Sequence, residues 1–210
     1  MDTDVVFVVD DDPAVRDSLA MLVRSAGWSV ETYDRAASFL AAYRPGRRGC
    51  LILDVRMPGM GGPELQAELK RRKIDLPVIF LTAHGDIPTT VKAIKAGAMD
   101  FLTKPVNGAV LLERVRGAIA QSARLQSEAL LSRTIQQRVA GLSAREREVM
   151  ALAAAGHSNK MIAQRLGISF RTVEAHRAQV MNKTGAANVV ELSRIAAACG
   201  MSGVAPGPNP

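Results

Sequence analysis

The first 105 residues alternate between short, uninterrupted apolar runs and longer stretches with helical periodicity. The apolar runs cover residues 5–9, 50–53, 77–81 and 101–102, and a shorter candidate covers residues 28–33. Runs without polar alternation are typical of strands that are buried on both faces, as in a parallel sheet covered by helices. The pattern therefore predicts five short, buried strands.

The stretches between these runs predict helices at residues 13–26, 35–43, 64–72 and 87–96, and from residue 110 onward. The first of them begins at Pro13, after a candidate N-cap at Asp12, and ends before Gly27. Strands that alternate with helices build a doubly wound α/β domain. We expect a five-stranded parallel sheet with helices on both faces over residues 1–120.

Beyond residue 118 the pattern becomes entirely helical. Residues 118–140 contain no Gly or Pro and carry a patchy apolar stripe, which predicts a helical linker over 121–140, with a short dimerising seam as the alternative. Ser143 and Glu146 form a capping box that opens a helix to residue 155. Further helices are predicted at 159–166, 170–184 and 188–199, and the glycine-containing connection before residue 170 has helix-turn-helix spacing. Residues 141–200 thus form a four-helix domain, and 201–210 a disordered tail.

Polar residues follow each strand of the predicted sheet. Because parallel strands point their carboxyl ends to one edge, where such sheets bind ligands, these side chains converge. The set is Asp10, Asp11, Asp54, Thr82 and Lys104. The alternative is that each residue only solvates the start of its loop.

Clustered carboxylates repel one another unless a cation screens them or a proton neutralises them. Oxygen ligands without His or Cys favour Mg²⁺ over zinc. With Mg²⁺ held by Asp11 and Asp54, an oxygen of Asp54 could attack a phosphoryl group and form an acyl phosphate. Lys104 and the hydroxyl of Thr82 could then bind the phosphoryl oxygens.

Charge separates the chain into two parts. Its net charge is +7, but residues 1–120 hold 16 Lys and Arg against 15 Asp and Glu, whereas residues 121–210 hold 11 against 5. The basic excess in the second part predicts a polyanionic partner. Two distant cysteines, an acidic N-terminus and the absence of a long apolar run predict a cytoplasmic protein with no membrane contact.

The motifs of the first part resemble a CheY-like receiver domain of bacterial two-component systems. They are VVDDD at 8–12, ILDVRMPGMGG at 52–62, LTAHGD at 81–86 and AGAMDFLTKP at 96–105. The resemblance implies that Asp54 is phosphorylated by a cognate sensor histidine kinase. It also implies that Asp10 and Asp11 are the acidic pair of the Mg²⁺ site, which Asp54 and the backbone carbonyl of Arg56 complete.

Further implications of this resemblance concern the phosphoryl group and its switch. Thr82 and Phe101 match the switch pair of receivers, in which phosphorylation draws Thr82 inward and the aromatic ring fills the vacated space. Lys104 would be followed by a cis peptide bond to Pro105. Asp12 is interpreted as a helix cap, and His84 as a rim residue.

The third helix of the second part is the candidate DNA reader. Val173, His176 and Val180 share one face and should be buried, while polar and small residues on the opposite face can approach base edges. Basic residues around it would contact phosphates. The predicted DNA contacts are Lys160, Arg171, Thr172, Glu174, Ala175, Arg177, Ala178 and Lys183.

Residues 142–196 resemble a LuxR-type helix-turn-helix, carried by LSAREREVMALAAAGHSNKMIAQRLGISFRTVEAHRAQVMNK and the following VVEL. The family usually has Leu where this chain has Met150, and often an apolar residue at Thr184, which could loosen packing there. Together the two parts resemble a FixJ-type response regulator. This implies a homodimer on phosphorylation that binds a two-part site on double-stranded DNA, with RNA polymerase as a further partner and activation as the usual outcome.

Two other functions compete with this interpretation. One is an Mg²⁺-dependent phosphatase with an aspartyl nucleophile, but Asp54 is followed by Val55 and Arg56 and so lacks the second acid that protonates a leaving group. The other is a constitutive DNA-binding protein with a vestigial receiver, which the complete acidic and basic set argues against. We expect slow self-dephosphorylation and no other enzymatic activity.

Overall fold

The computed structural model describes residues 4–83 and 97–201. The chain divides into two compact units, residues 1–127 and 128–210, which are treated separately below. His84 and the helix predicted at residues 87–96 lie outside the described residues. No helix within the described ranges is both long enough and apolar enough to span a bilayer.

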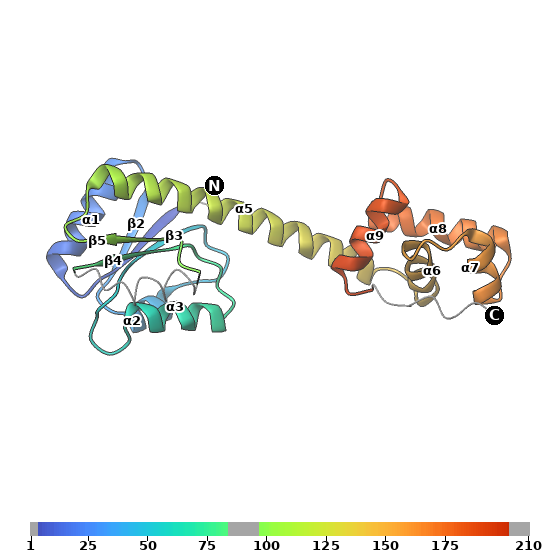
Figure 1. Ribbon diagram of the computed structural model, residues 1–210, viewed down its shortest axis with the longest axis horizontal. Helices are drawn as coiled ribbons and strands as arrows, with labels where there is room; N and C mark the ends of the chain where they lie inside the picture. Colours follow the sequence, from blue (N-terminus) through green and yellow to red (C-terminus); the bar gives the residue numbers. More distant parts are fainter. Residues whose placement is uncertain (1–3, 84–96, 202–210) are drawn as a thin grey trace. The chain divides into compact units, whose positions relative to one another are not determined.

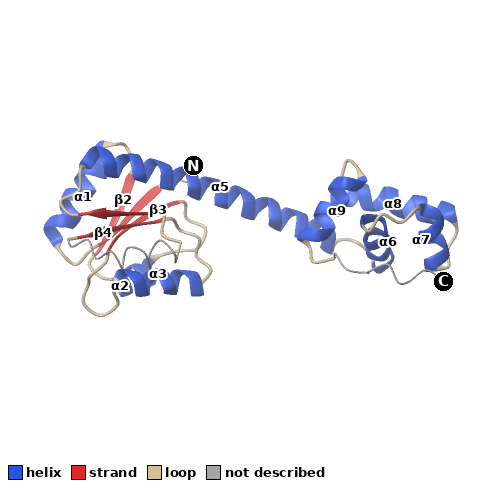
Figure 2. Cartoon of the chain, viewed as in Figure 1, coloured by secondary structure: helices blue, strands red, loops and turns tan. Residues whose placement is uncertain are grey.

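The first unit is built on a sheet of five parallel strands, as the apolar runs predicted. The strand order is β2-β1-β3-β4-β5, and strands are red in Figure 2. β1, β3 and β4 are buried along their whole length, in keeping with sequences that are apolar up to the polar last residue of β3 and β4. The strands are β1 (Val5–Val9), β2 (Ser29–Tyr33), β3 (Gly49–Asp54), β4 (Val78–Thr82) and β5 (Asp100–Thr103).

Helices cover both faces of this sheet (Figure 1). On one face lie α1 (Pro13–Ser25) and the N-terminal part of α5 (Gly108–Ala140), whose apolar side chains share a core with alternate strand residues. On the other face lie α2 (Ala36–Ala42) and α3 (Gly62–Arg71). The doubly wound α/β architecture is confirmed.

One helix, α5, serves both units. Leu111 and Val115 near its start are fully buried in the core of the first unit, and Ser122 accepts a hydrogen bond from the backbone N–H of Gly49 at 3.2 Å. Ile135 and Val139 near its end pack in the core of the second unit. The segment predicted as a helical linker, residues 121–140, is part of α5, whose two ends each belong to a core.

The second unit consists of α6 (Ala144–Ala154), α7 (Asn159–Leu166), α8 (Phe170–Thr184) and α9 (Val189–Ala198), together with the end of α5. Serine N-caps lie where the sequence predicted them. Ser143 and Glu146 form the capping box of α6, in which each side chain accepts a hydrogen bond from the other residue's backbone N–H, and Ser169 caps α8. α7 ends at Gly167, which has the left-handed conformation that glycine adopts readily.

The predicted buried face of α8 is confirmed for two of its three residues. Val173 and Val180 are buried, whereas His176 is only half-buried because it lies at the margin of that face. Thr184 is buried without a loss of hydrogen bonding, since its hydroxyl donates to the backbone carbonyl of Val180 at 2.7 Å. The threonine at this position therefore fits the helix end.

Candidate functional site

The sheet register brings the acidic residues of the first unit together. Val9 pairs with Leu53 in neighbouring strands, so Asp10, immediately after β1, stands beside Asp54, the last residue of β3. Both carboxylates are buried, with exposed fractions of 1% for Asp10 and 7% for Asp54. Two buried acids at adjacent strand ends require a positive partner.

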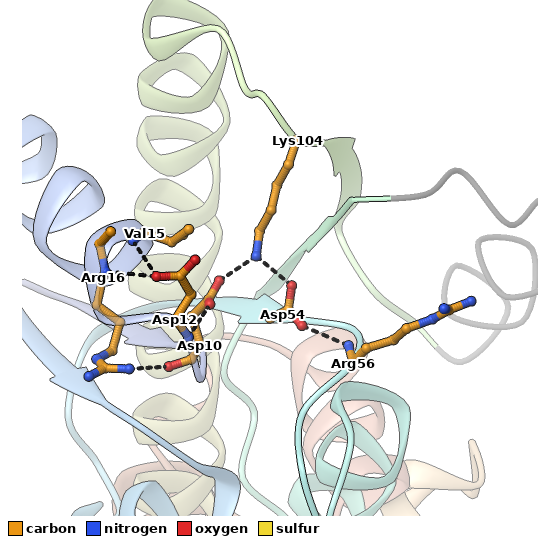
Figure 3. A network of polar contacts seen from close by, with 8 residues as sticks. Asp10, Asp12, Val15, Arg16, Asp54, Arg56 and Lys104 are labelled. Carbon is orange, nitrogen blue, oxygen red and sulfur yellow. Dashed lines mark hydrogen bonds and ion pairs between the residues drawn. The ribbon is translucent and has the colours of Figure 1, made fainter.

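Lys104 is that partner. Its Nζ lies 2.6 Å from Oδ2 of Asp10 and 2.6 Å from Oδ1 of Asp54 (Figure 3). The lysine follows β5, its backbone N–H donates to the carbonyl of Thr82 at 2.6 Å, and its peptide bond to Pro105 is cis, as predicted. Burial opposes the charged form of Lys104, but its hydrogen bonds to the two carboxylates outweigh this effect and raise its pKa.

Asp54 is held at both oxygens. While Oδ1 receives Lys104, Oδ2 accepts the backbone N–H of Arg56 at 2.7 Å, and the Arg56 side chain extends away from the carboxylate (Figure 3). Burial raises the pKa of Asp54, and the hydrogen bond from Lys104 opposes that rise. The carboxylate is thus partly stripped of water and fixed in direction, which is a favourable state for a nucleophile.

The β1–α1 loop fixes Asp10 in a similar way. Its Oδ1 accepts the backbone N–H of Asp12 at 3.0 Å. Asp12 itself caps α1, accepting the N–H of Ala14 at 2.8 Å, which confirms the interpretation of this acid as a cap. Arg16 donates to the backbone carbonyl of Asp10 at 2.8 Å. Arg16 was not predicted as a site residue, and no spacing in the sequence reveals a side chain that reaches backward from a helix to a carbonyl.

The expected convergence of three carboxylates is only partly realised. Asp10 and Asp54 meet at Lys104, whereas the side chain of Asp11 is exposed. Among the described residues, no three His, Cys, Asp or Glu side chains lie close enough together to hold a metal. Two buried carboxylates against one ammonium still leave a negative excess, and every predicted ligand donates oxygen. This donor set fits a hard divalent cation.

The proposed switch residues lie beside this cluster. Thr82 ends β4 and is buried, and it pairs in register with Thr103 of β5. Phe101 of β5 is half-buried against the core, with its ring centroid 6.2 Å from that of Phe80. The two residues thus lie on neighbouring strands, and Thr82 directly follows Leu81, the register partner of Asp54.

In the second unit, α8 presents the predicted reading face to solvent. Arg171, Glu174, Ala175 and Ala178 are exposed, and Lys160 on α7 is exposed as well. Thr172 is less available, because its backbone N–H and its hydroxyl both contact the hydroxyl of the N-cap serine.

Two other predicted DNA contacts are engaged within the domain. Arg177 donates to Oδ1 of Asn159 on α7 at 2.7 Å. Lys183 pairs with both carboxylate oxygens of Glu146 on α6, at 2.8 and 2.7 Å. The sequence identified both residues as basic but could not show that each has an intramolecular partner.

Comparisons with known proteins agree with this geometry. The family profile of the response regulator receiver domain matches residues 6–116, and that of bacterial regulatory proteins of the luxR family matches residues 140–196. The chain is 47% identical over 201 residues to the transcriptional regulatory protein FixJ of Azorhizobium caulinodans, covering 96% of this chain and 94% of that protein. It is also 47% identical over 192 residues to the C4-dicarboxylate transport transcriptional regulatory protein DctR of Rhodobacter capsulatus, covering 90% and 98%.

Solved structures show the same likeness. The response regulator StyR superposes with a TM-score of 0.82 at 42% identity, covering 93% of this chain and 98% of that chain. Full-length FixJ from B. japonicum superposes with a TM-score of 0.56 at 41% identity, covering 97% and 100%.

The chain belongs to the response regulators of two-component signal transduction. Among them it is of the FixJ type, in which a receiver domain is combined with a LuxR-type DNA-binding domain, and it regulates transcription. These relatives are transcriptional regulators, which agrees with the expectation that the chain is not an enzyme.

Proposed function

We propose that Asp54 accepts a phosphoryl group from a sensor histidine kinase and that the acyl phosphate controls DNA binding. The observation that carries this proposal is the pairing of one Lys104 ammonium with two buried carboxylates at adjacent strand ends. An Asp54 oxygen attacks phosphorus while the bond to the donor's imidazole nitrogen breaks, and that nitrogen retains the electron pair. Lys104 then turns from Asp54 to a phosphoryl oxygen.

These residues suit Mg²⁺, which Asp11, Asp54 and the backbone carbonyl of Arg56 would hold, with Asp10 as the second member of the acidic pair. When bound, the ion would neutralise charge on the phosphoryl oxygens. The chain's own contribution is to hold Asp10 and Asp54 in fixed directions through the backbone N–H groups of Asp12 and Arg56.

Labelling with a radioactive phosphodonor tests the acceptor. Asp54→Asn should abolish phosphate incorporation, whereas Asp12→Asn should retain it, because Asn caps a helix as well as Asp and the carboxylates paired with Lys104 are those of Asp10 and Asp54. Labelling of the Asp54→Asn protein would disprove the assignment.

We also propose slow hydrolysis of the acyl phosphate by the chain itself, measurable as decay of the label after the donor is removed.

Phosphorylation adds about −1.5 to −2 charges at the edge of the sheet. Thr82 moves toward this charge and Phe101 fills the space, which changes the surface around β5 and promotes homodimerisation. Light scattering with and without a small phosphodonor measures the change in mass. An unchanged mass would exclude dimerisation as the output.

The second unit reads double-stranded DNA in the cytoplasm through α8. Bases are contacted by Arg171, Glu174, Ala175 and Ala178, and phosphates by Lys160. A dimer implies a two-part, approximately palindromic site, and the activating output implies contact with RNA polymerase. Two experiments test this mode of DNA binding. The phosphorylated protein is used to select duplexes, and its affinity for a selected duplex is then measured against salt concentration, with and without phosphodonor. A phosphodonor that alters neither affinity nor mass would refute the switch.

The functional boundaries follow from these roles. We assign the receiver to residues 1–120 and the DNA-binding domain to 141–200. Residues 121–140 connect them as part of α5.

A further inference from the structure

The last turn of α8 is fixed to its own domain by an ion pair. Nζ of Lys183 lies 2.8 Å from Oε1 and 2.7 Å from Oε2 of Glu146. The side chain of Glu146 is only 7% exposed, and that of Lys183 is 39% exposed. Two of the three donors of the ammonium are therefore directed into the domain at a nearly buried acid.

Glu146 holds this position for a reason independent of DNA. It is the third residue of α6, and its Oε2 also accepts the backbone N–H of the N-cap residue Ser143 at 2.7 Å. The hydrogen bond from Lys183, followed by that from Ser143, lowers the pKa of Glu146 to about 2. The acid is therefore charged at neutral pH, and loss of Lys183 would leave that charge without its cation.

A second contact holds the same end of α8. Arg138, near the end of α5, donates to the carbonyl of Thr184 at 3.3 Å, which is one of the carbonyls that a helix C-terminus leaves unpaired. Gly185 then terminates the helix in the left-handed conformation. The two contacts come from two different helices, so they restrict how the end of α8 can tilt.

The position of Lys183 around α8 also separates it from the reading face. At about 100° per residue, it stands about 120° around the helix from Arg171. Arg171 and Ala175 define the exposed face, whereas Lys183 is turned toward α6, where Glu146 lies.

We propose that Lys183 is a positioning residue, which sets the angle of α8 through its ion pair with Glu146, and that it does not neutralise a DNA phosphate. The inference rests on the proposed reading of DNA by α8. It replaces the interpretation of this lysine as a phosphate contact. The ion pair then determines how well the bases are distinguished, whereas a phosphate contact would add affinity for any sequence.

The experiment measures binding of the phosphorylated full-length protein to a selected duplex and to a scrambled duplex over a range of salt concentrations. For Lys183→Gln we expect the preference for the selected duplex to fall about tenfold, while the slope of log affinity against log salt stays unchanged. Lys183→Arg, which can pair with the same carboxylate, should retain the preference. Lys160→Gln is the matched control and should lower the slope by about 0.9 with the preference intact.

Glu146→Gln gives the decisive comparison, because Gln preserves the capping box but removes the charge. Removing an acid should strengthen binding to DNA if only overall charge matters. We expect instead the same loss of preference as in Lys183→Gln, and no further loss in the double variant. Circular dichroism at the assay temperature verifies that each variant is folded.

Three outcomes would overturn the inference. A slope lowered by about 0.9 in Lys183→Gln, with the preference kept, would show a phosphate contact. A folded Lys183→Gln protein with unchanged preference and slope would show that the pair contributes to stability alone. A wild-type protein that does not distinguish the two duplexes would refute the reading role of α8 itself, and this inference with it.

Discussion

A methyl group added at Gly62 should destabilise the receiver domain directly beneath the phosphorylation site. Gly62 is the first residue of α3, and a Cβ built on it would lie 2.5 Å from the backbone carbonyl oxygen of Asp54, 2.8 Å from the Phe80 ring and 3.2 Å from Cα of Val55. Real Cβ atoms do not approach other atoms so closely. Since two of these atoms belong to the backbone of the β3 end, the strain cannot be relieved by a side-chain rotation.

The expected cost follows from the kind of atom that must move. Overpacking of a filled core costs about 1–3 kcal/mol, and a clash with backbone belongs at the upper end, about 3 kcal/mol. The matched control is Gly117→Ala, also within a helix, where the nearest atom to the new Cβ is Cε of Met99 at 3.1 Å. That atom ends a flexible side chain, so helix propensity should dominate and stabilise the protein by about 0.5–1 kcal/mol.

Urea unfolding followed by tryptophan fluorescence measures both effects in the receiver alone. Trp28 is the only tryptophan of the chain and packs against the core between the sheet, α1 and α5. Gly62→Ala should lower the unfolding midpoint and should also slow phosphate incorporation, because the Asp54 end of β3 is displaced. Equal midpoints for Gly62→Ala and Gly117→Ala would refute the reasoning.

Three shorter predictions follow from other contacts. Folding lowers the pKa of Glu146 from 4.5 to about 2, so its charged form stabilises the DNA-binding domain above pH 4.5, and this stabilisation is lost as the pH falls toward 2. Acid unfolding followed by helical circular dichroism should therefore depend less on pH in Glu146→Gln than in the wild-type protein. Burial raises the pKa of Cys50 to about 12, whereas Cys199 is partly exposed. A thiol reagent should therefore modify Cys199 well before Cys50 in the native protein, as measured by mass spectrometry. Equal rates of modification would contradict the burial of β3. Asp12→Ala removes the N-cap of α1 and should cost about 1 kcal/mol in urea unfolding, while Asp12→Asn should cost little.

The sequence predicted the sheet and most of the helices because the central strands β1, β3 and β4 are apolar runs and because α1, α6, α7, α8 and α9 each begin at a side-chain N-cap. It also predicted that Asp10, Asp54 and Lys104 meet, since parallel strands end at one edge. It could not predict the direction of individual side chains. The exposure of Asp11, the reach of Arg16 and the ion pair of Lys183 depend on packing between elements distant in the sequence.

The course of α5 also has a practical consequence for dissecting the chain. Gln126 of this helix donates to the carbonyl of Gly46 in the receiver at 2.8 Å, and packing of the helix in the DNA-binding core begins at Ile135. Residues 127–133 between them are exposed and belong to neither core. A cut or a foreign domain placed in these two turns would leave both hydrophobic cores whole, so this is where receivers and DNA-binding domains of different origin could be exchanged.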